Sequence, residues 1–566
     1  MGLADFIPAA RWLKGYSRRN AVADLLAGVI LSVLLVPQAM AYALLAGLPP
    51  EAGLYTAILP PLIYMLLGTS NYASMGPVAL ASLLVADAIG ASGLDAREAA
   101  AIIAVEVGAL LIILGLLRLG RIVNFISDPA LLGFTAAAAV LIAASQIPAI
   151  LGIEIERSGN IVDTVAALWP KLGSFDGATL ALGAGALVLL LVGDRYGGAA
   201  LWKFGVHPPW RTALVKAVPL LVLMASAAVA AIWLSGVETV RRPPSGLPPI
   251  TIPGFTHDSW LALLPSSGVI AIVIFVTGMA VAKSLAGRSR QDLDTSREAI
   301  AIGAASIGGA LTGGYAPGVS LSRSALVFDS GGRTPLASGI AAIIVLVVAL
   351  FFAAPLAYLP KAALAALVIS AVFSLVKIRA MQATWRHSKS ETLVIVMTLG
   401  TTLLLGVQWG LAAGAAACIA AFLWFSSLPR ITRLGTREGG GYLRSVDRED
   451  VELDTLPVLA IRFDHSLYFG NVGHVEDRFL THLSRHDDVQ CLLIDMKGVN
   501  DVDYSGMAML ERLVEQVKEQ DVRIAFAEVR DPVRDKLNVN HVLRGCNSYP
   551  TSSEGVEAMR KDCDTT

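Results

Sequence analysis

Charged residues are scarce in this sequence. Asp, Glu, Lys and Arg make up 16% of its 566 residues, whereas soluble domains average about 25%. The mean hydropathy is correspondingly high, at +0.64. A chain with so little charge is not a soluble globular protein, a disordered chain or a basic nucleic-acid binder, so no nucleic-acid partner is expected.

Paired cysteines and enzyme motifs are also absent from the sequence. The four cysteines, Cys418, Cys491, Cys546 and Cys563, include no CxxC pair. They predict neither a disulfide framework nor a metal site, and three cysteines near the C-terminus suit a reducing cytosol. The sequence has no Walker Gly-Lys-Ser/Thr, HExxH or GxSxG motif, which argues against an ATP-driven pump or another enzyme. No cofactor is expected.

Long uncharged runs are abundant in the first 429 residues. A membrane-spanning helix needs about 20 mostly apolar residues, and these runs predict a polytopic α-helical membrane protein with about 12 to 14 spans. The remaining residues are more polar and carry a net negative charge. Among the runs are Leu25–Pro50, Ala52–Ala86, Pro129–Ile153, Ser259–Ala282, Thr334–Pro360 and Thr392–Pro429.

Basic residues predict the orientation of the chain. Four of them precede the first apolar run, where no signal-peptidase site follows, so the N-terminus should lie in the cytoplasm. Further basic clusters recur at intervals of roughly two spans, up to the end of the last run. An even number of spans in the cell (cytoplasmic) membrane, with both chain ends cytosolic, satisfies all of them. The four N-terminal residues are Arg11, Lys14, Arg18 and Arg19.

Two segments interrupt the hydrophobic pattern in corresponding halves of the membrane portion. Ser74–Ala79 and Gly313–Ser320 both place Pro and Gly before a stretch that spans only about half a bilayer. Paired interrupted helices of this kind point to a midplane binding site in inverted-repeat transporters. Two half-helix N-termini aimed at one point would form an anion site.

Arg323 follows the second interrupted segment and should lie near the middle of the membrane. An arginine there costs about 2.5–3.5 kcal/mol to insert, so it needs a partner or a function. It is either the fixed cation of an anion site, with Ser320 and Ser322 as hydroxyl donors, or one half of an ion pair with Asp87 or Asp329.

Several motifs resemble those of one known family. Pro37–Ala43 (PQAMAYA), Gly53–Tyr55 (GLY) and Gly76–Ala79 (GPVA) resemble the N-terminal signature of the sulfate permease (SulP/SLC26) family of anion transporters. Ser320–Ser324 (SLSRS), followed by a Gly-Arg-Thr tripeptide, resembles its second-half signature. Asp503–Gly506 (DYSG) is similar to the hallmark of a STAS domain. The resemblance covers essentially the whole chain.

The resemblance implies a fold and a site. It implies 14 membrane segments in two inverted seven-span repeats, roughly residues 1–240 and 255–429, which form a core and a gate domain. It also implies a homodimer, and a substrate site between the third and tenth segments with contributions from the first. Matched residue by residue, the substrate-binding positions are Gln38, Tyr42, Gly76, Pro77, Val78, Ala79, Ser320, Ser322 and Arg323.

Ion coupling is the point at which the sequence departs from part of the family. The resemblance implies a glutamate in the eighth helix of proton-coupled plant carriers, but Ile274–Lys283 contains no carboxylate, and Thr277 falls near the expected position. Asp87 and Glu106 are other carboxylates in the predicted membrane segments. Each of them either couples an ion (H⁺ or Na⁺) or is structural.

The C-terminal residues 451–566 should form a cytosolic α/β domain with a mainly parallel sheet, joined by a linker over 430–450. Ser505 either caps the helix that follows it or, as the resemblance to a STAS domain implies, is phosphorylated. The predicted strands are Leu456–Phe463, Cys491–Met496 and Val522–Ala527, and the predicted helices are Asn471–Leu483 and Ser505–Val517.

The sequence thus predicts a transporter. The favoured function is secondary active transport of an inorganic oxyanion, with sulfate first, by alternating access across the membrane. Bicarbonate or dicarboxylate transport on the same fold, and a channel-like anion conductor, remain alternatives because turnover and substrate choice are not legible in these motifs.

Overall fold

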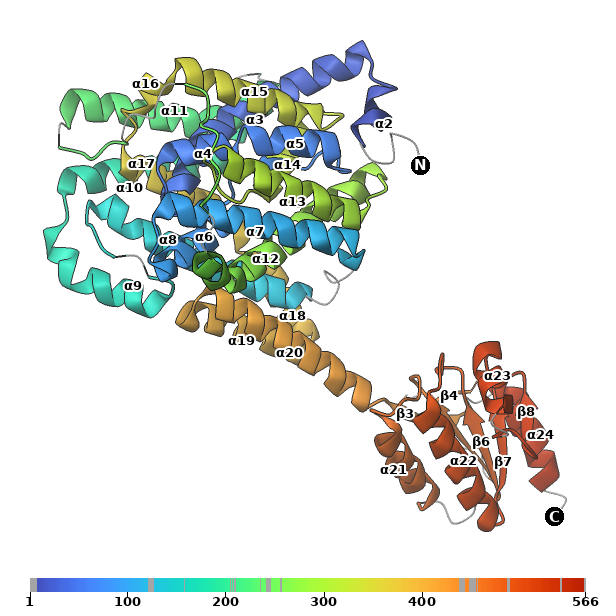
Figure 1. The fold of residues 1–566 in the computed structure, drawn as a ribbon. Helices are drawn as coiled ribbons and strands as arrows, with labels where there is room; N and C mark the ends of the chain where they lie inside the picture. Colours follow the sequence, from blue (N-terminus) through green and yellow to red (C-terminus); the bar gives the residue numbers. More distant parts are fainter. Residues whose placement is uncertain are drawn as a thin grey trace. The chain divides into compact units, whose positions relative to one another are not determined.

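The computed structural model describes residues 8–120, 127–156, 158–203, 205, 207, 210–234, 236–240, 246–254, 257–436, 443–446, 455, 457–485, 489–539 and 542–563. The chain divides into two compact units, Met1–Cys418 and Ile419–Thr566. Figure 1 shows the first unit as a body of helices and the second as a sheet flanked by helices.

The first unit is built almost entirely from helices. The helices of its first half are α2 (Ala9–Leu13), α3 (Arg18–Leu45), α4 (Pro50–Thr56), α5 (Leu59–Leu67), α6 (Ala79–Ser92), α7 (Ala96–Leu116), α8 (Asp128–Leu151), α9 (Ile161–Leu168), η2 (Trp169–Ser174), α10 (Gly177–Lys203) and α11 (Trp210–Trp233). Those that follow are α12 (His257–Ser289), α13 (Thr295–Leu311), α14 (Leu321–Asp329), α15 (Leu336–Phe351), α16 (Ala353–Leu356), α17 (Lys361–Val372), η3 (Phe373–Leu375), α18 (Ile378–His387), α19 (Lys389–Leu405) and α20 (Val407–Ser427), which continues into the second unit.

The helices confirm a polytopic membrane protein. Eight helices in the described part of the chain are long and apolar enough to cross a membrane. The helices α6 and α15 are apolar but shorter, and α14 has only nine residues. Two half-length helices, α6 and α14, therefore stand where the two interrupted segments predicted them. The total of 14 segments and the inverted symmetry remain predictions.

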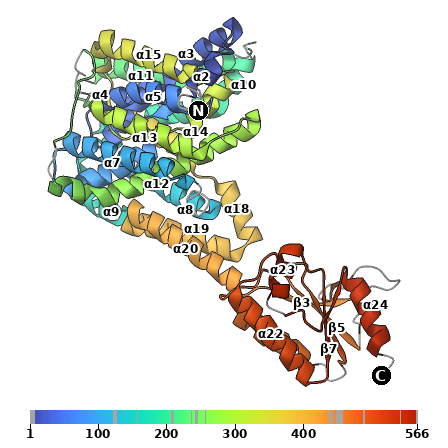
Figure 2. The same ribbon diagram turned by 45° about the vertical axis from the view of Figure 1, so that its right-hand side comes forward.

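Helices from the two predicted repeats pack against one another. In both Figure 1 and Figure 2, α7 lies beside α13. A Cβ atom on Gly108 of α7 would come within 2.6 Å of the Gly303 carbonyl oxygen of α13, and one on Gly303 would meet the Gly108 oxygen at the same distance. Only glycine permits this close contact. Gly108 and Gly303 therefore allow α7 and α13, from the two predicted repeats, to pack closely.

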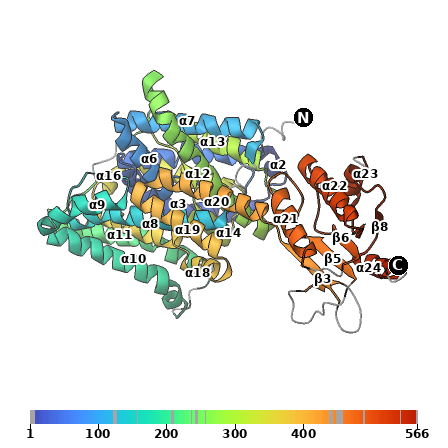
Figure 3. The same cartoon turned by 90° about the horizontal axis from the view of Figure 1, so that it is seen from below.

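The second unit is the predicted α/β domain. Its sheet has the strand order β4-β3-β5-β6-β7-β8, and the strands from β5 to β8 are parallel. Figure 3 shows helices on both faces of this sheet. The alternation of buried residues along β5 and β6 explains the two layers, because successive side chains point to opposite faces. The strands are β3 (Ile431–Gly435), β4 (Arg444–Ser445), β5 (Val458–Phe463), β6 (Cys491–Asp495), β7 (Arg523–Ala527) and β8 (Asn547–Tyr549); the helices are α21 (Val472–Leu483), α22 (Tyr504–Glu519), α23 (Asp531–Val539) and α24 (Ser552–Cys563).

Part of the predicted linker is strand. Within residues 430–450, β3 pairs with β5 and β4 in antiparallel register, while residues 437–442 and 447–450 lie outside the described residues. Leu456, the predicted start of the next strand, also lies outside them. The antiparallel partner of β3, strand β5, is about 30 residues away in the sequence. The Gly and charge content of the segment alone therefore could not predict that it forms a strand.

The cysteines and the helix cap differ from the predictions. Cys491 on β6 and Cys563 at the end of α24 form a disulfide across a Cα separation of 6.7 Å, because α24 packs on that face of the sheet. The prediction of no disulfide was wrong for this pair. Helix α22 is capped by Asp503, whose carboxylate accepts from the Gly506 amide at 2.8 Å, and not by Ser505, which lies inside the first turn.

Candidate anion site

The two interrupted segments meet in the middle of the first unit. Residues Met75–Gly76 form β1 and Gly318–Val319 form β2, and the two short strands pair antiparallel with Gly76 opposite Gly318. The amide of Ser320 donates to the Ser74 carbonyl at 3.1 Å and extends the pairing. Helix α6 begins three residues after β1, and α14 begins two residues after β2. This pairing of β1 with β2, called the crossing below, therefore brings the N-termini of two half-length helices together.

The N-terminal turns of these two helices differ in how they are capped. Val78 precedes α6 and offers no side-chain cap, so the first amides of α6 have no side-chain partner there. Ser320 precedes α14, and its hydroxyl accepts from the Arg323 amide at 3.4 Å. The Ser320 hydroxyl also lies 3.3 Å from that of Ser322. Each N-terminus contributes about half a positive charge.

Arg323 is fully buried in this crossing. Its Nη1 donates to the Pro77 carbonyl at 2.8 Å and to Oε1 of Gln38 at 3.4 Å. Its Nε and Nη2 have no hydrogen-bond partner among the residues that the structure describes. A buried cationic donor without a partner carries a large desolvation cost, so this edge of the guanidinium is suited to an anion.

The structural alternative for Arg323 was an ion pair with Asp87 or Asp329. Within the described residues, the polar partners of the Arg323 side chain are the Pro77 carbonyl and Gln38, and neither is a carboxylate. No carboxylate of the described residues therefore neutralises Arg323, which lies between two helix N-termini. The positive charge of the guanidinium and the partial charges of the two helix N-termini lie together in apolar surroundings, and this arrangement favours an anionic ligand.

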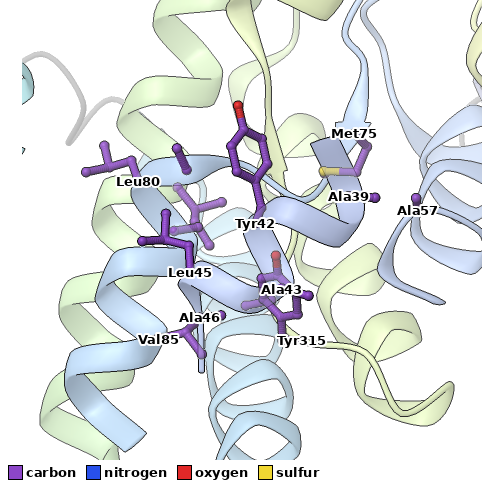
Figure 4. Packing of buried hydrophobic residues seen from close by; sticks show 14 of the residues in the cluster. Ala39, Tyr42, Ala43, Leu45, Ala46, Ala57, Met75, Leu80, Val85 and Tyr315 are labelled. Atoms are coloured by element: carbon purple, nitrogen blue, oxygen red, sulfur yellow. The ribbon is translucent and has the colours of Figure 1, made fainter. Parts of the chain in front are cut away.

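The first helix of the site, α3, contributes Gln38 and Tyr42. Both are buried, with 5% and 7% of their surface exposed, and Pro37 lies inside the same helix. Figure 4 shows Tyr42 and neighbouring α3 residues among Met75, Leu80 and Tyr315. The structure thus gathers the predicted residues of the first, third and tenth segments, namely Gln38, Tyr42, Gly76, Pro77, Val78, Ala79, Ser320 and Arg323, with Ser322 exposed at the start of α14.

Hydroxyl groups that were not predicted also hold the β1–β2 crossing. The amide of Tyr315 donates to Thr56 Oγ1 at 2.9 Å, and its phenol oxygen lies 2.8 Å from the Ser82 hydroxyl. The Ser324 hydroxyl accepts from the Ser74 amide at 2.8 Å. Tyr315 lies within the second interrupted segment, and a phenol in an apolar run needs a polar partner. A tyrosine in this apolar run was therefore the sequence signal from which these hydroxyl contacts could have been predicted.

The three candidates for ion coupling have different surroundings. Thr277 donates its hydroxyl to the Val273 carbonyl of its own helix at 2.7 Å. Asp87 on α6 lines a cavity of about 700 Å³ together with Glu154, Asp176 and Glu238. Glu106 on α7 is 5% exposed, and its Oε2 has no partner in the part of the chain that is described. Ser505, the predicted phosphorylation site, lies in α22 of the second unit.

The sequence matches two known families. Residues 22–398 match the Sulfate permease family and residues 450–555 match the STAS domain. Among relatives, a protein named "Sulfate transporter 4.1, chloroplastic" from Arabidopsis thaliana is 33% identical over 93% of this chain and 78% of its own length. "Probable sulfate transporter MT1781" from Mycobacterium tuberculosis is 31% identical over 99% of both chains.

Solved structures share the fold. The structure titled "The overall structure of SLC26A9" superposes with a TM-score of 0.87 at 21% identity, covering 100% of this chain and 94% of that one. The transmembrane domain of a cyanobacterial bicarbonate transporter, BicA, superposes with a TM-score of 0.60 at 19% identity over 71% of this chain and 98% of its own. By its sequence matches, this chain belongs to the sulfate permease family and carries a C-terminal STAS domain.

Proposed function

We propose that this protein transports sulfate across the cytoplasmic membrane as a secondary active carrier. The observation that carries the proposal is the buried edge of Arg323, whose Nε and Nη2 have no partner among the described residues. The names of the relatives from Arabidopsis and Mycobacterium, both sulfate transporters, favour sulfate over bicarbonate or a dicarboxylate.

The geometry suits an oxyanion. The Nε–H and Nη2–H groups lie on one edge of the planar guanidinium and can donate to two oxygens of the same anion. The bond from Nη1 to the Pro77 carbonyl fixes the plane of the guanidinium against β1. The α6 amides and the hydroxyls of Ser320 and Ser322 add donors around the remaining oxygens.

The mechanism that we propose is alternating access. The substrate would lie between the crossing, which belongs to a compact core, and a gate domain that moves against it. We infer a homodimer with the N-terminus and the STAS domain in the cytosol, supported by the family assignment and by the basic residues that flank the predicted spans.

Glu106 is our candidate for a coupling residue, with a proton as the ion. A carboxylate buried in a membrane segment with one oxygen lacking a partner among the described residues is costly as an anion, so it favours proton uptake. Asp87 stands second, because it faces a wider polar cavity. Thr277 stands third, since its hydroxyl already bonds within α12. Phosphorylation of Ser505 remains a proposal for regulation.

The proposal is tested in proteoliposomes that contain the purified full-length protein. Radiolabelled sulfate uptake should saturate, and sulfate loaded inside should drive counterflow of the label. An excess of bicarbonate, oxalate, succinate or fumarate should compete less than unlabelled sulfate. Flux without counterflow would indicate a channel, and stronger competition by bicarbonate or a dicarboxylate would reassign the substrate.

A further inference from the structure

The short helix α18 lies between two apolar helices of the first unit. It is separated from α17 by η3 and by Val376, whose backbone is extended, and Ser388 separates it from α19, also in an extended conformation. Helix α17 has 12 residues and opens the apolar stretch Lys361–His387, of which α18 is the last part; α19 then continues as an apolar helix of 17 residues. Because α18 is the charged end of that stretch and the helix breaks at Ser388 before α19, α18 is expected at a membrane surface.

The exposed face of α18 is amphipathic in a specific way. Ile378 and Trp385 lie seven residues apart, on the same side of the helix, and are 60% and 69% exposed. Arg379 and Arg386 have the same spacing and form a second exposed stripe beside the first. An apolar stripe with a large aromatic next to a stripe of arginines is typical of a helix that lies in the membrane interface.

The sequence from Ser330 to Ser390, which contains α18, carries charge of one sign. Between Asp329 and Glu391 the sequence contains no Asp or Glu. Lys377, Arg379, Arg386 and Lys389 are all exposed, and no ion pair involving any of them occurs within the described part of the chain. These four cations, which no carboxylate of the described residues pairs with, form a basic patch, the α18 patch, which fits an anionic surface.

We propose that the α18 patch binds the phosphate headgroup of an anionic phospholipid. Arg379 and Arg386 contact the phosphate oxygens, while Ile378 and Trp385 insert at the boundary between headgroups and acyl chains. The exposed apolar residues favour a lipid over a soluble acidic partner, because a soluble partner would leave no use for an indole at the interface. Bound in this way, α18 sets the depth of α17 and α19 in the bilayer. This inference does not depend on which anion is transported.

The lipid preference tests the proposal directly. The full-length protein is incorporated into nanodiscs of phosphatidylcholine and phosphatidylglycerol, and the lipids retained after release are counted by native mass spectrometry. The Arg379→Gln/Arg386→Gln variant should lose the preference for phosphatidylglycerol, by about fivefold for each arginine removed. The control variant Arg478→Gln/Arg485→Gln removes two exposed arginines of the second unit and should keep the preference. Retention of the preference in the α18 variant overturns the proposal.

A second measurement distinguishes lipid from protein around the helix. A spin label is attached at Gln382→Cys, which lies on the exposed face, in a Cys418→Ser/Cys546→Ser background. The label should collide more often with lipid-soluble oxygen than with a water-soluble nickel chelate, whereas a label at Val539→Cys, 76% exposed in the second unit, should show the opposite. If the label at position 382 is shielded from both reagents, protein covers α18. If it collides with the nickel chelate as often as with oxygen, water covers α18. Either result contradicts the proposal.

Discussion

Arg323 donates to the carbonyl of Pro77 at 2.8 Å, although 246 residues separate them in the sequence. This bond joins the first turn of α14 to the segment that precedes α6, so the two half-length helices share one cation. The same guanidinium reaches Gln38 on α3. Three membrane segments are thereby held around a single positive charge, which explains why one side chain dominates the expected behaviour of the site.

Arg323→Ala should abolish saturable sulfate uptake while leaving a folded, monodisperse protein. The two helix N-termini supply only about half a charge each, which does not offset the dehydration of a divalent anion. Arg323→Lys should recover part of the uptake, because lysine keeps the charge but loses the planar pair of donors. Uptake and substrate Kd are measured on the purified variants, with Arg288→Ala, an exposed arginine, as the control.

Unchanged apparent affinity in Arg323→Ala would show that the arginine is structural. The anion site would then have to lie elsewhere, and the cavity beside Asp87 would be the next place to search.

Gly76→Ala should impair both transport and stability. Gly76 has φ = +144°, a backbone conformation that is open to glycine and costs other residues about 1–3 kcal/mol. The substitution strains β1 at the residue that faces Gly318. Gly90→Ala is a matched control in α6, because a Cβ atom there meets nothing within 4 Å. Thermal stability in detergent should fall for Gly76→Ala alone; equal values for the two variants would refute the strain argument.

The sequence was informative wherever the signal is local. Pro and Gly before short apolar stretches located α6 and α14, and short apolar runs located β5, β6 and β7 within one or two residues. Contacts between segments that lie far apart in the sequence could not be predicted. The register of Gly76 opposite Gly318, the bond from Tyr315 to Thr56 and the pairing of β3 with β5 depend on the packing of the whole fold. The choice between Asp503 and Ser505 as the cap depends on a shift of the helix start by two residues, and both side chains are good caps.

Asp503→Ala should destabilise the STAS domain more than Ser505→Ala. The Asp503 carboxylate caps α22 through the Gly506 amide and also accepts from the Phe469 amide at 2.8 Å. Loss of a cap typically costs about 0.5–2 kcal/mol, whereas Ser505 makes no cap contact in this turn. Hydrogen exchange of α22 amides in the full-length protein measures the difference. Faster exchange in Ser505→Ala than in Asp503→Ala would reverse the assignment of the cap.

Glu106→Gln should remove the dependence of sulfate uptake on an inward proton gradient while leaving counterflow intact. The amide keeps the size of the side chain but cannot bind and release a proton, so exchange of sulfate for sulfate continues without coupling. Uptake with and without the gradient is compared among the wild type, Glu106→Gln and Asp87→Asn. Because Asp87 faces a wide cavity and Glu106 is enclosed between helices, the loss should be confined to Glu106→Gln. Loss in Asp87→Asn alone would transfer the coupling role to α6, and a gradient effect that persists in both variants would mean that neither carboxylate carries the proton.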